Sequence, residues 1–494
     1  MSIWTSKYQR LTAVDRGFLD MEDDSLHMHV GSVAIFETGD LSTPEGGVDF
    51  GRIRDYIASR LHRVPRYRQK ITYTPVERHP VWVDDDRFNI DYHLRHTALP
   101  RPGDERQLKR LAGRLMSQQL DRGKPLWEIW VVEGLGPDRF AIINKVHHCM
   151  IDGISGNEIL QQIYTPAPKE HHASPRPFRA RDLPSALELF MGATKRRFEA
   201  PVAVARTMRD AALAPTRALR RTLETAPAVG RVFDNWSQLA SPTPINQPIG
   251  PHRRFDWLQM DLDRVRAVKT KMNGTVNDVV LTVVAGAMAR FFEDHGIDPG
   301  SQEQMRFRVF CPVSLRGERE RSTLGNRVAM TIVDLPLGNR PPQERLDGVK
   351  ESFRSFRESK EALGADVLTS ASNWMAPTLV SLSFRMSYRR RAGNMVVTNV
   401  PGPQVPLYLL GARMLETYPL VPLFIEQCLG IALFSYAGRL FWGFNSDWET
   451  MPDLHALVEN VSEAFAELEA HVGSRRVQAV QGPCYGPTPC ARTS

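Results

Sequence analysis

The sequence predicts an α/β (α+β) fold of two mixed regions joined by a helical crossover segment, and two observations indicate this. Short runs rich in Val, Ile and aromatic residues, typical of strands, alternate with apolar residues at helical spacing in both halves of the chain. Between the halves the composition changes to proline and basic residues, as is typical of a connecting segment. The chain has 494 residues, 42% hydrophobic and 24% charged, so it can form two or three globular domains.

The first region, residues 1–165, is expected to be mixed α/β. Its strands are predicted from β-branched and aromatic runs and its helices from apolar residues three and four positions apart. The predicted elements are a strand at 30–36, a helix at 52–61, strands at 127–132 and 140–146, and a helix after Asp152-Gly153.

Residues 166–250 are predicted to be a basic helical linker. Prolines and basic residues dominate at 164–181, and helical pieces with more basic than acidic residues follow at 183–232. A basic amphipathic helix can lie on an anionic bilayer, and it can equally be a solvated crossover between domains. Both interpretations stay open here.

The second α/β region is expected at 251–472, followed by a disordered, Gly/Pro-rich tail at 473–494. The predicted elements are a helix at 278–292, strands at 307–313, 328–335 and 395–398, a hairpin of strands 429–436 and 439–444, and a closing helix at 454–468.

The charge and cysteine content limit the partners and the compartment. A formal net charge of +7 favours an anionic partner, such as nucleic acid, a lipid surface or a phosphorylated cofactor. Five scattered cysteines show no metal-ligand spacing, and the first residues lack the features of a secretory signal, so a cytoplasmic location is expected. The most apolar helical stretch, 276–292, contains Asn277, Asp278 and Arg290, so a membrane-spanning helix is not expected.

The segment VHHCMIDGISG places two histidines at the end of a predicted strand, with a carboxylate and a glycine just beyond. Imidazole titrates near neutrality, so it can remove a proton from an alcohol and return it to a leaving group. Adjacent side chains on a strand point to opposite faces, so either His147 or His148, but not both, can face a given cavity. Gly153 permits a tight turn, and Asp152 can cap the following helix or pair with a cation.

The same segment is compatible with other interpretations. A buried histidine pair with a capping aspartate would be purely structural. A zinc site lacks third and fourth ligands at suitable spacing, and a serine hydrolase lacks the G-x-S-x-G turn. Cys149 could be a nucleophile, but a small buried hydrophobic residue is favoured.

HHCMIDG matches the HHxxxDG motif, and the chain resembles the bacterial wax ester synthase/acyl-CoA:diacylglycerol acyltransferase family. Five further stretches resemble that family in the same order: LTAVDRGFLDMEDD with MHVGSVAIFE, KPLW at 124–127, VNDVV at 276–280, PVSLR with LGN at 312–326, and TNVPGP at 398–403. The resemblance implies two chloramphenicol acetyltransferase-like domains, each a mixed β-sheet with flanking helices.

The resemblance also implies roles for the motif residues. His148, the second histidine, would be the general base, and His147 would be structural because it faces the other way. Asp152 would hold the loop through an arginine such as Arg316, or simply cap a helix. No covalent acyl-enzyme is implied, and Cys149→Ser is expected to stay active.

The remaining motif residues have a functional and a structural interpretation each. Asn277, beside Asp278, could donate a hydrogen bond to the oxyanion or cap the helix that follows. Pro125, Leu126 and Trp127 could line the acyl or acceptor channel or belong to the core. The candidates for structural pairing or contact with coenzyme A are Arg316, Asn326, Asn399, Pro401 and Gly402, the last three in an expected loop between the domains, and Arg327 could also meet its phosphates.

The function expected from the resemblance is transfer of a long-chain acyl group from acyl-CoA to a lipid alcohol. The acceptor would be diacylglycerol or a long-chain alcohol, at the inner membrane or a lipid droplet, with acyl-CoA as co-substrate and no bound cofactor or metal. The alternatives are a condensation-type enzyme with a carrier-bound acyl donor and a non-catalytic lipid-surface protein. No nucleic-acid-binding motif is present, so nucleic acid is not an expected partner.

Overall fold

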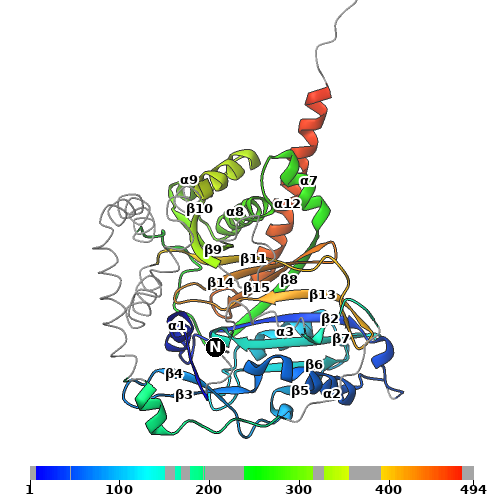
Figure 1. Ribbon diagram of the computed structural model, residues 1–494. Helices are drawn as coiled ribbons and strands as arrows, with labels where there is room; N and C mark the ends of the chain where they lie inside the picture. The colour runs from blue at the N-terminus through cyan, green and yellow to red at the C-terminus, as the bar shows by residue number, and fades with distance from the viewer. Residues whose placement is uncertain are drawn as a thin grey trace, which may run out of the picture.

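The computed structural model describes residues 7–44, 46–150, 162–168, 178–192, 194, 238–314, 328–354 and 391–480. These residues form two six-stranded mixed sheets and one three-stranded sheet, with helices packed against them (Figure 1). The predicted mixed α/β class is therefore confirmed.

The first six-stranded sheet has the order β12-β13-β2-β7-β6-β5. Neighbouring strands run antiparallel except for β5 and β6, which are parallel. The predicted strands at 30–36, 127–132 and 140–146 are confirmed as β2, β6 and β7. The strand bounds are β12 Tyr408–Leu409, β13 Ala412–Leu420, β2 His29–Glu37, β7 Arg139–His147, β6 Trp127–Glu133 and β5 Leu94–Ala98.

The helices of the first half begin at side-chain caps. Thr12 caps α1, Asp49 caps α2, and Asp104 forms a capping box with Gln107 at the start of α3. The helix predicted at 52–61 is confirmed as α2. The bounds are α1 Ala13–Met21, α2 Phe50–Arg60 and α3 Glu105–Met116, with short 3-10 turns η2 Gly39–Leu41, η3 Leu61–Arg63, η4 Pro65–Arg68, η5 Ile90–Tyr92 and η6 His148–Met150. A small antiparallel sheet of β1 Gln9–Arg10, β4 Pro80–Asp84 and β3 Gln69–Tyr73 lies beside them (Figure 1).

The second six-stranded sheet has the order β10-β9-β11-β14-β15-β8. The predicted hairpin is confirmed, and its turn residues Ala437 and Gly438 both have positive φ, of 45° and 81°. The other strands predicted in this half are confirmed as well. The bounds are β10 Val328–Leu335, β9 Phe307–Ser314, β11 Met395–Pro401, β14 Leu429–Tyr436, β15 Arg439–Asp447 and β8 Arg253–Asp261.

Helix α8 is the buried centre of the second half. It spans Val276–Asp294, and nearly all its apolar side chains pack into a core with α12 and the sheet. Among the described residues no single helix is long and apolar enough to cross a membrane. Helices α7 and α8 taken together have the length and composition of a membrane span, but the pair is bent by 96°. The remaining helices are α7 Leu262–Lys271, α9 Pro299–Gln304 and α12 Leu454–Val480.

The sheets do not follow the order of the chain. Strand β13 comes from the second half but pairs with β2 of the first sheet (Figure 1). It also approaches β15 closely, because a Cβ at Gly443 would lie 1.8 Å from the carbonyl oxygen of Pro419. The two halves are thus joined by a strand as well as by the connecting segment.

The predicted disordered tail was wrong at its start. Helix α12 continues past Gly473 to Val480 and projects from the fold (Figure 1). The glycine does not end the helix, because the sequence from 474 to 480 is compatible with helix and contains no proline. Most of the predicted helical linker and the helix predicted after Asp152-Gly153 lie outside the described residues.

Candidate active site

His148 lies at the point where β7 ends and the chain turns. The last residue of β7 is His147, and His148 begins the turn η6. The backbone N–H of His148 donates a hydrogen bond to the carbonyl oxygen of Met28 at 2.7 Å. Its ring stacks on Phe18 of α1, with the ring centroids 3.9 Å apart, so backbone and side chain are both held.

The environment of His148 favours its neutral form. Burial is the main cause that lowers the pKa of this imidazole, to about 4, and the neighbouring His147 lowers it further. The residue is nevertheless only partly buried, and its Nδ1 has no hydrogen-bond partner in the described part of the chain. A neutral imidazole that keeps some exposed surface is what a general base requires.

His147 points into the interior, as expected for its neighbour on a strand. Its side chain is fully buried, and its Nδ1 accepts a hydrogen bond from the backbone N–H of Cys149 at 3.1 Å. An accepting Nδ1 places the ring proton on Nε2, which lies 3.5 Å from Oε2 of Glu22. The two histidines therefore have different environments.

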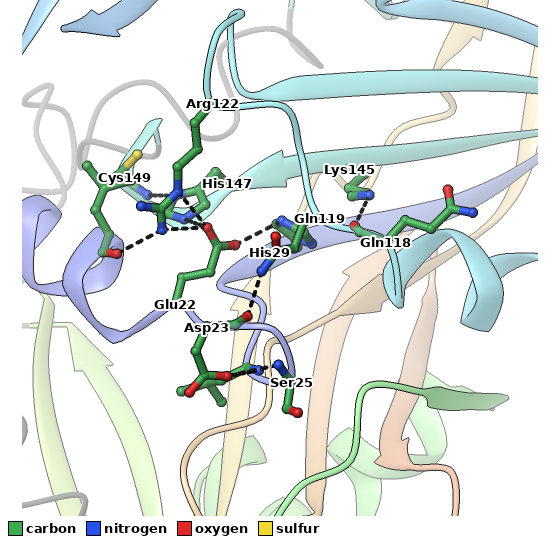
Figure 2. A network of polar contacts seen from close by, with 12 residues as sticks. Glu22, Asp23, Ser25, His29, Gln118, Gln119, Arg122, Lys145, His147 and Cys149 are labelled. Carbon is green, nitrogen blue, oxygen red and sulfur yellow. Dashed lines mark hydrogen bonds and ion pairs between the residues drawn. The ribbon is translucent and has the colours of Figure 1, made fainter.

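Glu22 is the centre of a buried polar cluster (Figure 2). Its carboxylate, only 3% exposed, lies 3.3 Å from His29 Nε2 and receives Arg122 at 2.8 Å. Burial alone would raise the pKa of this carboxyl, but hydrogen bonding with His147 and His29 holds that pKa well below its usual range. Glu22 is therefore a buried anion surrounded by three nitrogen-bearing side chains.

A buried lysine lies on the same strand as His147. Lys145 donates to the carbonyl oxygens of Leu115 and Gln118 at the end of α3, the first at 2.9 Å (Figure 2). Burial lowers the pKa of this amine to about 8. Among the described residues no group of three or more His, Cys, Asp or Glu side chains is arranged to hold a metal.

The segment Pro125-Leu126-Trp127 packs in the core beside β7. The carbonyl oxygen of Leu126 accepts the N–H of His147 at 3.0 Å. Trp127 is fully buried; its indole donates to the Tyr67 carbonyl at 2.8 Å and its ring stacks on His93. These are contacts of core residues, and the role in a channel wall stays a prediction.

The predicted capping role of Asn277 was wrong. Helix α8 is capped by Thr275, which forms a capping box with Asp278. The sequence offers two capping residues within three positions, and the helix starts at the first. The Asn277 amide instead contacts Cys311 Sγ at 3.6 Å, and its role toward an oxyanion stays a prediction.

The expected loop at 399–403 is largely strand. Asn399 and Pro401 belong to β11, which runs parallel to β14. Gly402 is required by packing rather than by turn geometry, because an added Cβ would lie 2.3 Å from the Phe434 ring and 2.4 Å from the Ser435 carbonyl oxygen. Pro401 is exposed.

Several predicted site residues lie outside the described residues. They are Asp152, Gly153, Arg316, Asn326 and Arg327. The proposed ion pair between Asp152 and Arg316 therefore stays a prediction.

Comparison with known families gives two matches along the chain. The model of the wax ester synthase/diacylglycerol acyltransferase catalytic domain matches residues 11–280, and that of the C-terminal domain of the same family matches 324–469. The chain belongs to this family. The predicted family and the enzyme class, an O-acyltransferase of the wax ester synthase/diacylglycerol acyltransferase type, are confirmed.

Individual relatives agree with the family match. A Mycobacterium tuberculosis protein named as a diacylglycerol O-acyltransferase is 32% identical over 467 residues, covering 93% of this chain and 90% of the relative. O-acyltransferase WSD of Acinetobacter baylyi is 28% identical over 475 residues, covering 94% and 98%.

Solved structures confirm the two-domain fold. The wax ester synthase/diacylglycerol acyltransferase from Marinobacter aquaeolei VT8 matches with a TM-score of 0.65 and 24% identity, covering 94% of this chain and all of that one. The first condensation domain of the CDA synthetase matches with a TM-score of 0.56 and 16% identity, covering 94% and 97%. At these identities the likeness shows the fold alone.

The polar cluster beside His147 in this acyltransferase, formed by Glu22, His29 and Arg122, was not predicted from the sequence. Glu22 and His29 lie in two stretches that entered only through their family resemblance, LTAVDRGFLDMEDD and MHVGSVAIFE. Arg122 lies two residues before the KPLW stretch. One signal was available, because pairing β2 with β7 antiparallel places His29 opposite His147.

Proposed function

We propose that this chain transfers a long-chain fatty acyl group from acyl-CoA to a lipid alcohol, with His148 as the general base. The acceptor is diacylglycerol, which gives triacylglycerol, or a long-chain alcohol, which gives a wax ester. The observation that carries the proposal is the neutral, partly exposed imidazole of His148 at the end of β7, inside the segment matched by the catalytic-domain model.

The reaction needs one proton to move twice. His148 removes the hydroxyl proton as the alcohol oxygen attacks the thioester carbonyl, and a C–O bond forms. The tetrahedral intermediate then expels the coenzyme A thiolate, and the imidazolium returns the proton to that sulfur. The ring nitrogen that accepts the hydroxyl proton must carry the lone pair, so in the neutral ring the proton lies on the other nitrogen.

Two neighbours bear on this mechanism. Burial raises the pKa of Cys149 well above its usual value, which disfavours a thiolate nucleophile and supports direct transfer. The amide of Asn277 at the start of α8 is the donor we propose for the oxyanion.

The relatives support the choice of substrates. Their names specify a diacylglycerol O-acyltransferase and O-acyltransferase WSD, and a starter condensation domain of rhizomide synthetase with a TM-score of 0.57 was solved in complex with C8-CoA. The mechanism above is the same for either lipid acceptor.

The test is an acyl-transfer assay with the purified chain. Labelled palmitoyl-CoA is incubated with diacylglycerol, long-chain alcohols and short-chain alcohols, and the lipid products and released thiol are counted together. We expect equal amounts of ester and thiol, and a His148→Ala variant that folds but loses about 10² to 10⁴ in kcat. Activity only with a carrier-bound acyl donor, or near-normal turnover by the variant, would contradict the proposal.

We also propose that the enzyme works at a membrane or lipid-droplet surface on the cytoplasmic side. The helix at 186–192 packs Leu189 inward against β4 but exposes Leu187, Phe190 and Met191, three apolar side chains at helical spacing. Flotation with anionic vesicles tests this: Leu187→Glu with Met191→Glu should weaken vesicle binding and leave turnover of a soluble short-chain acceptor unchanged.

A further inference from the structure

The buried carboxylate of Glu22 has no part in the proposed reaction, yet it contacts His147, the residue next to the proposed base. Its side chain is 3% exposed and is contacted by His29, His147 and Arg122, each from a different segment (Figure 2). Burying a charge is costly unless it is paired, so this arrangement needs an explanation.

One path leads from Glu22 to the backbone of His148. The Nε2 of His147 lies 3.5 Å from the carboxylate, and its Nδ1 accepts the N–H of Cys149 at 3.1 Å. This acceptor exists only in the tautomer with the proton on Nε2, which the carboxylate favours. His148 lies between the two residues so joined, and its own N–H is held by Met28.

A second path leads from Glu22 to the ring of His148. Arg122 binds the Glu22 carboxylate and also donates to the carbonyl oxygen of Leu19 in the last turn of α1, at 2.9 Å. This fixes the end of α1, which carries Phe18, and Phe18 stacks on the His148 ring. Both the backbone and the ring of the base thus depend on the same carboxylate.

We propose that Glu22 is a positioning residue for the base: it fixes the tautomer of His147 and the end of α1, and thereby aims the His148 ring at the acceptor hydroxyl. The inference rests on the proposed function, because it assumes that His148 is the base. A misplacement of about 1 Å in a catalytic group can cost about 10²-fold in rate, which gives such a contact a measurable effect.

The first experiment compares two substitutions of Glu22 in the full-length enzyme. Glu22→Gln keeps an oxygen that can accept from His147 and Arg122, whereas Glu22→Leu keeps the volume and removes the acceptor. We expect Glu22→Leu to lower kcat about 10- to 100-fold with little change in KM for either substrate. Glu22→Gln should recover at least threefold of that loss.

The matched control is a buried carboxylate with comparable partners outside the cluster. Asp256 of β8 contacts His455 at 2.8 Å and Lys109 at 2.6 Å. Asp256→Asn should lower the melting temperature and leave kcat unchanged when assayed well below that temperature. This separates a general loss of stability from a loss of positioning.

The second measurement reads the tautomer of His147 directly. Nitrogen-15 spectra of histidine-labelled enzyme, with the His147 signals assigned through His147→Asn, distinguish a proton on Nε2 from one on Nδ1. The wild type should show the proton on Nε2, and Glu22→Leu should show a mixture or a shift to Nδ1. A purely structural Glu22 would leave this signal unchanged.

The outcomes separate this inference from the proposed function. Absence of acyl transfer by the wild type overturns the proposed function. An active wild type with unchanged kcat and unchanged tautomer in Glu22→Leu overturns the positioning role alone. If Glu22→Leu does not fold, the variants His147→Phe and His147→Asn are compared instead. Only the Asn side chain keeps an acceptor for the Cys149 N–H, so His147→Asn should have the higher kcat. Equal kcat values in the two variants would overturn the positioning role.

Discussion

Strands β7 and β15 are each nine residues long and each pairs antiparallel with the strand before it, but they end in different chemistry. β15 ends at Asp447, a buried carboxylate that accepts backbone N–H groups from Gly250, Glu449 and Thr450 at 2.8 to 3.1 Å. β7 ends at His147, and the next ring, His148, has a buried Nδ1 with no hydrogen-bond partner in the described part of the chain.

This difference separates a stabilising strand end from a reactive one. A carboxylate that accepts several backbone N–H groups fixes a turn, whereas an imidazole nitrogen without a partner can still exchange a proton with a substrate. The second half therefore supplies stability at the end of its hairpin, and the first half carries the proposed base. Each prediction below tests one side of this contrast.

The largest effect is expected at the stabilising end. Asp447→Ala removes an acceptor shared by three partly buried backbone N–H groups, so the free energy of unfolding should fall by about 3 kcal/mol, since bonds to charged groups contribute about 1.5 to 3 kcal/mol each and are not additive. Denaturant titration measures this, and kcat of the folded enzyme should not change. Asp447→Asn, which keeps one acceptor oxygen, is the control and should lose less; a fall in kcat at full stability would refute the contrast.

His29, which pairs opposite His147 at the end of β7, should make the free energy of unfolding depend on pH. Burial lowers the pKa of His29 to about 3, below the unfolded value near 6.5, so the folded state excludes a proton that the unfolded state binds. Its contribution is present above pH 6.5 and is lost as pH falls toward 3, by about 2 kcal/mol between pH 7 and pH 5. His29→Gln should reduce the pH dependence of unfolding by that amount.

The control for this prediction is a histidine of the second half. The His455 side chain is 70% exposed, so His455→Gln makes the same substitution without removing a buried imidazole. Equal effects of the two substitutions would show that burial around Glu22 does not govern the titration of His29.

Local features of this contrast could be predicted from the sequence, and contacts between distant segments could not. The strands ending at His147 and in the 439–444 run follow from their apolar composition, and the hairpin follows from Ala437-Gly438. The contact between Glu22 and His147 joins residues that are 125 positions apart and depends on how β2 pairs with β7. The addition of β13 to the first sheet is equally non-local, since its sequence is compatible with either sheet.

A smaller effect is expected at the residue after the base. Burial raises the pKa of Cys149 well above its usual value, so its thiolate is not available at neutral pH. Cys149→Ser should keep kcat within about threefold, and stability should fall by about 1 to 3 kcal/mol because a buried hydroxyl needs a partner. Loss of turnover to background, with the variant folded, would instead indicate a covalent intermediate on this sulfur.

The smallest effect is expected in the pH dependence of activity, which reports the protonation of His148. The base must be neutral to act, and burial lowers the pKa of His148 to about 4, so protonation reduces activity only as pH falls toward that value. At pH 5.0 about 90% of His148 is neutral, and kcat/KM should lose only about 10% relative to pH 7. An imidazole with the usual pKa of about 6.5 would be about 3% neutral at pH 5.0 and would lose about 25-fold relative to pH 7. The pH profile of kcat/KM measures this over the range in which circular dichroism shows the enzyme folded. The pH dependence of kcat/KM reports the ionisation of the free enzyme. A midpoint of this profile near pH 6.5 would mean that the His148 ring is solvated before substrate binds. The contrast between the ends of β7 and β15 would then not extend to His148.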